Sequence, residues 1–396
     1  MSSVAPDDVL IIATRRTPIG AFQGALAPAA APALGAAAIG AALKDAGLTA
    51  DALDEVLFGC VLSAGLGQAP ARQAALAAGI PTRVPCTTVS KVCGSGMKAV
   101  MLGSDAIRAG AAAVVMTGGM ESMSNAPYLL GKARSGYRMG HGELLDHMFL
   151  DGLQNAYDGK LMGVFAEATV RRYGFTRAEQ DAYVAQTIAR AVSATSSGAF
   201  GAELAPVTVR SRKGEWLISE DEIPPTCDPA KIANLKPAFD KDGTVTAASS
   251  SSIADGAAAV LLAAGASVKR LRLAPLARIV ASASFAQEPE WFTTAPVGAI
   301  RRVLERAGWG LNEVDLFEIN EAFAVVTMAA IRDLALDPQR VNVNGGACAL
   351  GHPIGASGAR IITTLIHALR ARALRRGVAA LCIGGGEATA IAVELV

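Results

Sequence analysis

The sequence predicts an α/β protein built from two duplicated α/β halves with a long inserted segment between them. Short apolar runs typical of buried strands alternate with helix-type runs near both ends of the chain. The order of these runs repeats: Ala42 to Gly47 resembles Val303 to Gly308, and Val114 to Gly119 resembles Ala380 to Gly385. The stretch 122–250 differs from both halves because it is richer in tyrosine, charge and turn residues.

The N-terminal half reads as alternating strands and helices. In order, we expect a strand at 8–14, a helix at 34–46 ended by Gly47, a strand at 55–61, a helix at 71–78, a strand at 84–89, a helix at 97–108 and a strand at 113–117. Such alternation calls for a parallel or mixed sheet covered on both faces.

The C-terminal half repeats this order, and the insert has elements of its own. Strands are expected at 276–281, 314–318 and 380–383, with helices at 297–307 and from Ala356 onward. In the insert, Thr176 is placed to cap a helix at 177–193, and a hairpin at 207–218 is expected to turn at Lys213-Gly214. The apolar run that ends at Leu262 is expected to be a helix. The domains are therefore 1–121 (with 251–273 returning to it), the loop domain 122–250, and 274–396.

Composition excludes several classes of function. The 36 basic and 35 acidic residues nearly cancel, which argues against binding to nucleic acid or to a membrane surface. Six cysteines without a C-x-x-C pair, and four histidines without a ligand spacing, argue against a disulfide scaffold or a metal site. The uncharged stretch from Thr17 to Leu43 is mostly alanine with two prolines, so a loop and a buried helix are expected there. Without a targeting signal, we expect a cytoplasmic protein.

Cys93 lies in the stretch that the rest of the chain is organised around. It sits on a glycine turn between a strand and a helix, where unpaired N–H groups and the helix dipole favour a thiolate. Two other interpretations remain open at this point. Cys93 can be a buried structural cysteine. Alternatively, Gly94, Gly96 and Ala99 match a dinucleotide-binding G-x-G-x-x-A, although the acidic residue that such a site needs is represented only by Glu121, just beyond the next strand.

Further polar residues follow predicted strands of the C-terminal half. His352 could take the proton of Cys93, Cys382 could act as a second acid or base, and Asn320 and the N–H groups of Cys93 and Gly384 could stabilise an oxyanion. Taken singly, each residue has a structural explanation: His352 can form hydrogen bonds within a loop, Cys382 can fill space in the core, and Asn320 can form a turn. Together, at matching positions of two halves, they predict acyl transfer through a thioester and proton removal beside a carbonyl.

These motifs resemble those of the thiolase family over essentially the whole chain. The resemblance is carried by Lys91-Val92-Cys93-Gly94-Ser95-Gly96, Asn320-Glu321-Ala322-Phe323-Ala324, Gly351-His352-Pro353-Ile354-Gly355 and Cys382-Ile383-Gly384-Gly385-Gly386. It implies a five-layer α-β-α-β-α fold in which Cys93 is acylated, His352 activates it, and Cys382 is the acid and base. Asn320 would hold a water beside His352 in one oxyanion hole, and Gly384 would serve the other. The implied partners are acetyl-CoA, acetoacetyl-CoA and coenzyme A, with no tightly bound cofactor, no metal, and a homotetramer assembled through part of the insert.

The resemblance also implies the substrate-binding residues. Ser251 matches a contact to the pantetheine arm, and the apolar wall is expected from Leu153, Met162, Phe239, Ala247, Ala322 and Phe323. Leu161 stands where many relatives have histidine, Phe292 where several have methionine, and Pro224 where some have an arginine near the adenine. Arg210, Arg212 or Lys213 could replace that arginine, although basic residues at a hairpin tip are usually only solvated.

The expected reaction interconverts two acetyl-CoA with acetoacetyl-CoA plus coenzyme A. The alternatives are a degradative 3-ketoacyl-CoA thiolase of fatty acid β-oxidation with a broader chain range, and an inactive coenzyme A binder. The physiological direction does not follow from the sequence, because the same groups serve both directions.

Overall fold

The computed structural model describes residues 4–212 and 214–396. Their main feature is one mixed sheet in the order β12-β13-β14-β11-β1-β10-β5-β3-β4, with the short β2 paired to β10. The strands are β1 (Val9–Arg16), β2 (Gly20–Ala21), β3 (Glu55–Gly59), β4 (Cys86–Val89), β5 (Val114–Ser122), β10 (Ala254–Ala264), β11 (Ala277–Ala286), β12 (Leu316–Ile319), β13 (Arg376–Ile383) and β14 (Glu387–Leu395).

The two parts of this sheet repeat one pairing pattern. In the N-terminal part β1 pairs antiparallel with β10, β10 antiparallel with β5, and β5 parallel with β3. In the C-terminal part the corresponding pairs are β11–β14, β14–β13 and β13–β12, in the same orientations. Even the irregularities match, because the register shifts between Ile11 and Ala13 and again between Ile279 and Ala281. The predicted duplication is confirmed, and β1 and β11 join the two parts.

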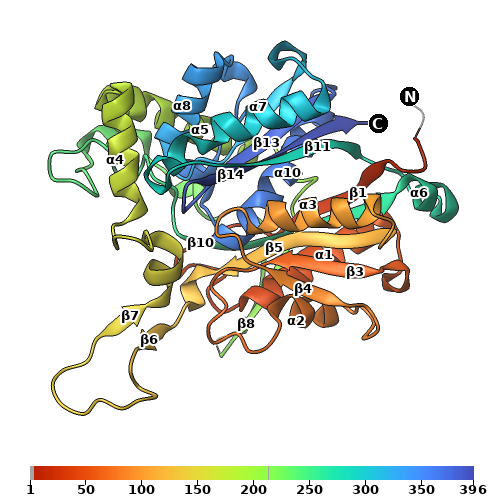
Figure 1. The fold of residues 1–396 in the computed structure, drawn as a ribbon, viewed down its shortest axis with the longest axis horizontal. Helices are drawn as coiled ribbons and strands as arrows, with labels where there is room; N and C mark the ends of the chain where they lie inside the picture. Colours follow the sequence, from red (N-terminus) through yellow and green to blue (C-terminus); the bar gives the residue numbers. More distant parts are fainter. Residues whose placement is uncertain (1–3, 213) are drawn as a thin grey trace.

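Helices cover both outer faces and fill the space between the two parts of the sheet (Figure 1). They are α1 (Ala31–Ala46), α2 (Pro70–Ala77), α3 (Ser95–Arg108), α6 (Gly265–Leu271), α7 (Ala295–Ala307), α8 (Ala324–Leu334), α9 (Ala347–Leu350) and α10 (Ile354–Ala371). One core packs α1 and α2 on the N-terminal part, a second holds α3 and α10 between both parts, and a third packs α7 and α8 on the C-terminal part. This is the expected five-layer α-β-α-β-α arrangement.

The segment between the halves forms a separate group of short elements. They are β6 (Tyr128–Leu130), β7 (Leu144–Asp146), α4 (Met162–Tyr173), α5 (Arg177–Ser196), β8 (Val207–Ser211) and β9 (Gly214–Ile218). Thr176 caps α5 in a capping box with Glu179, as the sequence predicts for the start of this helix. The hairpin β8–β9 is also as predicted, although its tip residue Lys213 lies outside the described residues. Sequence reasoning did not identify α4 or the β6–β7 arm, which extends away from the layers (Figure 1).

Short helical turns connect these elements. The 3-10 turns are Ala50–Ala52, Met123–Asn125, Pro224–Thr226, Pro229–Asn234, Pro289–Thr294, Leu311–Glu313 and Pro338–Arg340, and a π-type turn spans Phe149–Leu153.

The prediction of a helix ending at Leu262 is wrong. These residues form strand β10, which lies between β1 and β5 in the sheet. Nearly every residue of β10 is buried, since layers cover both faces. A strand buried on both sides shows a continuous apolar run instead of an alternating one, and such a run cannot be distinguished from a buried helix by its period.

The uncharged stretch near the N-terminus forms a loop followed by the buried helix α1, as predicted. The helix begins at Ala31, earlier than expected, because Pro32 occupies the first turn, where its missing N–H costs nothing. Over residues 4–212 and 214–396, none of the helices combines the length and the apolar character needed to span a bilayer.

Candidate active site

A cavity of about 210 Å³ lies where loops from both halves and from the insert meet. Its lining includes Cys93, His352 and Gly384, which come from three loops far apart in the sequence. The remaining wall is mainly apolar. The cavity is lined by Val92, Cys93, Phe149, Gly152, Leu153, Leu161, Met162, Gly163, Phe239, Ser250, Ser251, Ile253, Phe292, Ala322, Phe323, His352, Ile354 and Gly384.

Cys93 is presented by a strained turn between β4 and α3. Val92 has a φ of 45°, a left-handed conformation that costs a β-branched residue on the order of 1–3 kcal/mol. The Ser95 hydroxyl holds this turn by accepting from the Lys91 N–H at 2.8 Å and donating to the Val92 carbonyl at 2.6 Å. These contacts hold Cys93, which is half-buried, at the cavity wall.

The thiol of Cys93 is not acidic in this structure, contrary to the expectation from its position at a helix N-terminus. Burial raises its pKa to about 11, although the backbone N–H groups of Gly384 and of Cys93 itself oppose this by favouring the thiolate. Desolvation of the charged form therefore outweighs the helix end. Cys93 needs a base to become a nucleophile.

His352 has the tautomer that such a base requires. Its Nδ1 lies 2.5 Å from the Ser357 hydroxyl, and that hydroxyl lies 2.9 Å from the Pro353 carbonyl, to which it donates its only proton. The hydroxyl must then accept from Nδ1–H, which leaves Nε2 with a free lone pair. Nε2 is buried and has no hydrogen-bond partner within the described part of the chain.

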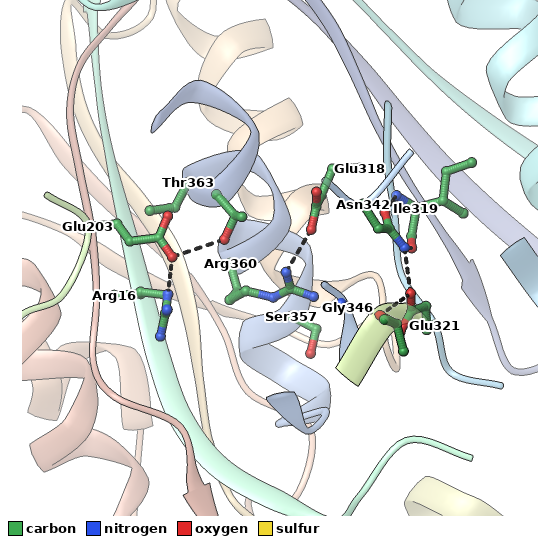
Figure 2. A network of polar contacts seen from close by, with 12 residues as sticks. Arg16, Glu203, Glu318, Ile319, Glu321, Asn342, Gly346, Ser357, Arg360 and Thr363 are labelled. Carbon is green, nitrogen blue, oxygen red and sulfur yellow. Dashed lines mark hydrogen bonds and ion pairs between the residues drawn. The ribbon is translucent and has the colours of Figure 1, made fainter. Parts of the chain in front are cut away.

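The same imidazole is kept neutral. Burial, and secondarily the positive charge of Arg360, lowers the pKa of His352 to about 3. Arg360 lies on α10 one turn beyond Ser357 and pairs with Glu318 at 2.9 Å (Figure 2). The positive charge of Arg360 disfavours a second positive charge on the His352 imidazole.

Asn320 follows β12 and is fully buried. Both polar atoms of its side chain lack a partner among the described residues. The carboxylate of the neighbouring Glu321, in contrast, has hydrogen-bond partners. It accepts from the Asn342 amide at 2.9 Å (Figure 2). It also accepts from the Thr187 hydroxyl at 2.9 Å. An unsatisfied buried amide is costly, so Asn320 is suited to hold a polar species such as a water molecule.

Cys382 lies behind the cavity wall and is fully buried at the end of β13. It packs in one cluster with wall residues that include Phe292, Ala322 and Phe323. Burial, and then the charge of Cys93, raises its pKa well above the usual value of a thiol. The two cysteines therefore interact electrostatically.

Most predicted binding residues come together in the cavity. Ser251, Leu153, Met162, Phe239, Phe323, Ala322, Leu161 and Phe292 all line it. Ala247 is exposed and is not part of this lining in the described structure, so its role stays a prediction. Arg210 and Arg212 are exposed on the hairpin, where Arg210 pairs with Glu215 at 2.8 Å.

Two buried residues that contact the candidate site or the loop carrying His352 were not predicted from the sequence: Ser357 and Glu121. Ser357 lies five residues after His352, a spacing that places it on the first turns of the following helix and could have suggested contact. Glu121 was considered only as the acidic residue of a dinucleotide site. Its carboxylate is buried and accepts N–H groups of Val61, Leu62 and Gly355, so it is not free to bind a ribose.

Known families and proteins match this chain over nearly its whole length. The model of the thiolase N-terminal domain matches residues 9–266, and that of the thiolase C-terminal domain matches residues 273–395. An acetyl-CoA acetyltransferase of Pseudomonas aeruginosa is 51% identical over 97% of this chain and 98% of its own. The crystal structure of the Bacillus anthracis acetyl-CoA acetyltransferase superposes with a TM-score of 0.97 at 40% identity, covering 100% of both chains. A thiolase from Ascaris suum in complex with coenzyme A gives a TM-score of 0.93 at 44% identity, over 98% of this chain and 100% of that one.

Proposed function

The chain belongs to the thiolase family, a family of acyltransferases, and we propose that it interconverts two acetyl-CoA with acetoacetyl-CoA plus coenzyme A. The observation that carries this proposal is that Cys93, His352 and Gly384 line one mainly apolar cavity and that Cys382 is buried against residues of its wall. The names of the relatives support acetyl-CoA as the substrate, and the coenzyme A complex of the Ascaris suum thiolase supports coenzyme A as a ligand.

In the first step, Nε2 of His352 takes the proton of Cys93. The sulfur then attacks the thioester carbonyl of acetyl-CoA, a water held by Asn320 and the imidazole stabilise the oxyanion, and the proton passes to the departing coenzyme A thiolate. The unpartnered lone pair on Nε2 of the neutral imidazole is the acceptor that this proton transfer needs.

In the second step, the Cys382 thiolate removes a proton from the methyl group of a second acetyl-CoA. The resulting carbanion attacks the acetyl carbonyl on Cys93, the carbon–sulfur bond breaks, and acetoacetyl-CoA leaves. The proton that Cys382 gained passes to the released Cys93 thiolate, which restores both cysteines for the next cycle. The backbone N–H groups of Cys93 and Gly384, which are hydrogen-bond donors to the Cys93 sulfur, would stabilise the second oxyanion. Each step reverses in thiolysis, so these groups serve both directions.

The range of acyl chains is the open part of the proposal. Leu161 and Phe292 both line the cavity, and their apolar side chains could also accept a longer acyl chain, as in a degradative 3-ketoacyl-CoA thiolase. Coenzyme-A-dependent cleavage of acetoacetyl-CoA, 3-ketohexanoyl-CoA and a longer homologue separates these functions. Cleavage mainly of the four-carbon substrate is the expected result. Equal or faster cleavage of the longer ones would favour the degradative enzyme, and no cleavage would favour an inactive coenzyme A binder.

We further propose that four copies assemble through the β6–β7 arm and that the enzyme works in the cytoplasm. The arm exposes several large apolar side chains, namely Tyr128, Leu130, Met139 and Leu144. Exposed apolar side chains gathered on one projection suit burial against another copy. Light scattering of the intact protein should give the mass of a tetramer, and Leu144→Ser with Leu130→Ser should yield dimers.

A further inference from the structure

Glu121 at the end of β5 connects three segments of the chain through one buried carboxylate. Its Oε2 accepts the Val61 N–H at 3.0 Å and the Gly355 N–H at 2.9 Å, and its Oε1 accepts the Leu62 N–H at 3.1 Å. The thiol of Cys60 also donates to Oε1, at 3.7 Å. The Glu121 side chain is fully buried, so each of these bonds replaces hydration that the carboxylate has lost.

One of these partners belongs to the loop that carries His352. Gly355 is the second residue of α10, three positions beyond His352. A carboxylate at the N-terminus of this 18-residue helix also gains from the helix dipole. The contact is tight: a Cβ on Gly355 would lie 2.6 Å from the Met120 carbonyl, and one on Gly119 would lie 2.0 Å from the Gly355 carbonyl. The start of α10 therefore rests directly on the backbone of β5.

We propose that Glu121 is a positioning residue that fixes the His352 loop of the C-terminal half against the N-terminal half, which carries Cys93. The inference rests on the proposed function, because it assigns Glu121 the task of placing the base of that reaction. Glu121 acts through the Gly355 N–H and does not line the cavity in the described structure. It also interacts electrostatically with Cys93.

The proposal has a consequence for the pH dependence of the reaction. Burial raises the pKa of Glu121 to about 7, although its three N–H donors oppose the shift. Below this pH the Glu121 carboxylate is protonated, and the oxygen that carries the proton no longer accepts as well from the backbone N–H groups that donate to it. The titratable groups near it are Cys60, Cys93, His352 and Asp255; the pKa values of Cys93 and His352, about 11 and about 3, lie far from neutrality. The pKa of Cys60 lies far above neutrality, and that of Asp255 is raised from 3.8.

The test compares wild type with Glu121→Gln, Glu121→Asp and Glu222→Gln in acetoacetyl-CoA thiolysis between pH 5.5 and 8.5. Gln at 121 places an NH₂ group against the N–H donors. We expect kcat at pH 8 to fall about 10- to 100-fold, as for a misplaced base, with KM for acetoacetyl-CoA changed less than about threefold. Wild-type kcat should decline as the pH falls through about 7, and this decline should be missing in Glu121→Gln.

The controls separate positioning from general loss of structure. Glu222 is a carboxylate that likewise accepts backbone N–H groups, those of Ala21 and Ala25, and it does not line the cavity in the described structure, so Glu222→Gln should lose stability but keep kcat and its pH profile. Glu121→Asp keeps a titrating carboxylate and should keep the decline below pH 7, even if Glu121→Gln does not fold. An unchanged kcat at pH 8 in Glu121→Gln, or an acid decline that survives in it, would overturn the proposal. Absence of thiolysis in wild type would instead count against the proposed function.

Discussion

Burial, and then the charge of Cys93 when its thiol is ionised, raises the pKa of Cys382, so the protonation of one cysteine depends on the chemical state of the other. When Cys93 carries an acetyl group, this charge is gone, and Cys382 loses one of the two causes of its raised pKa. In the proposed mechanism, formation of the acyl-enzyme would therefore favour ionisation of Cys382 for the second step.

The first prediction concerns Cys382→Ser. A serine hydroxyl is a far weaker acid than a thiol, so the variant should still be acetylated on Cys93 but should lose condensation and thiolysis by at least about 10³-fold. Mass spectrometry after mixing with acetyl-CoA measures acetylation, and steady-state assays measure turnover. Equal loss of both activities would remove Cys382 from its proposed role.

The second prediction concerns Ser357→Ala, which removes the group that orients Nδ1 of His352. Acetylation of Cys93 should slow about 10- to 100-fold, because no hydroxyl then keeps the proton on Nδ1 and the free lone pair on Nε2 of the imidazole. Thr363→Val is the matched control, since it removes another buried hydroxyl of α10, one that pairs with Thr14. It should lower stability and leave acetylation unchanged. Equal rates in Ser357→Ala and wild type would contradict the assigned tautomer.

The third prediction is a pH dependence of stability that belongs to His352. Its pKa is lowered from 6.5 to about 3 in the folded state, so the unfolded state binds more protons at mildly acidic pH. Stability is therefore lost as the pH falls below about 6.5, by about 1.4 kcal/mol per pH unit. Wild type should lose about 1.4 kcal/mol relative to His352→Asn between pH 7.5 and pH 5.5 in urea unfolding. Glu121 changes the free energy of unfolding in the opposite direction, but it is present in both proteins, so its contribution cancels when their free energies are subtracted. Equal changes of the free energy of unfolding with pH in the two proteins would contradict the prediction.

The fourth prediction concerns the acyl-chain range. Phe292 is buried in the cavity wall and packs edge-on against Phe323 with ring centroids 6.4 Å apart. Phe292→Leu should enlarge the cavity and raise the ratio of kcat/KM for 3-ketohexanoyl-CoA over acetoacetyl-CoA by about 5- to 10-fold. Phe285→Leu, which changes a phenylalanine under Arg302 outside the cavity, should leave the ratio unaltered. A ratio that shifts equally in both variants would mean that Phe292 does not limit chain length.

Much of this architecture could be predicted from the sequence, because it depends on local patterns. The duplicated strands, the capped helix after Thr176 and the turn at Cys93 each have a local signal. The prediction for the segment that forms strand β10 was wrong because a strand buried on both faces lacks the alternation of apolar and polar residues that identifies a strand.

The positioning groups could not be predicted because their partners lie far away in sequence. Glu121 contacts residues about 60 positions before it and 234 positions after it, and the residues next to it in the sequence do not indicate either contact. Likewise, the raised pKa of Cys93 depends on burial by segments that fold around it, whereas the sequence shows only the helix end that favours the thiolate. Local chemistry predicts which groups react, whereas tertiary packing sets their protonation states.

The central claim is that Cys93 carries the acyl group, and the most direct test is to mix the enzyme with acetyl-CoA labelled in its acetyl group, quench in acid and map the label by peptide mass spectrometry. We predict one label per chain, on the peptide that contains Cys93, and none in Cys93→Ala, which should also have no turnover. Label on a different residue, or turnover that survives in Cys93→Ala, would contradict the account.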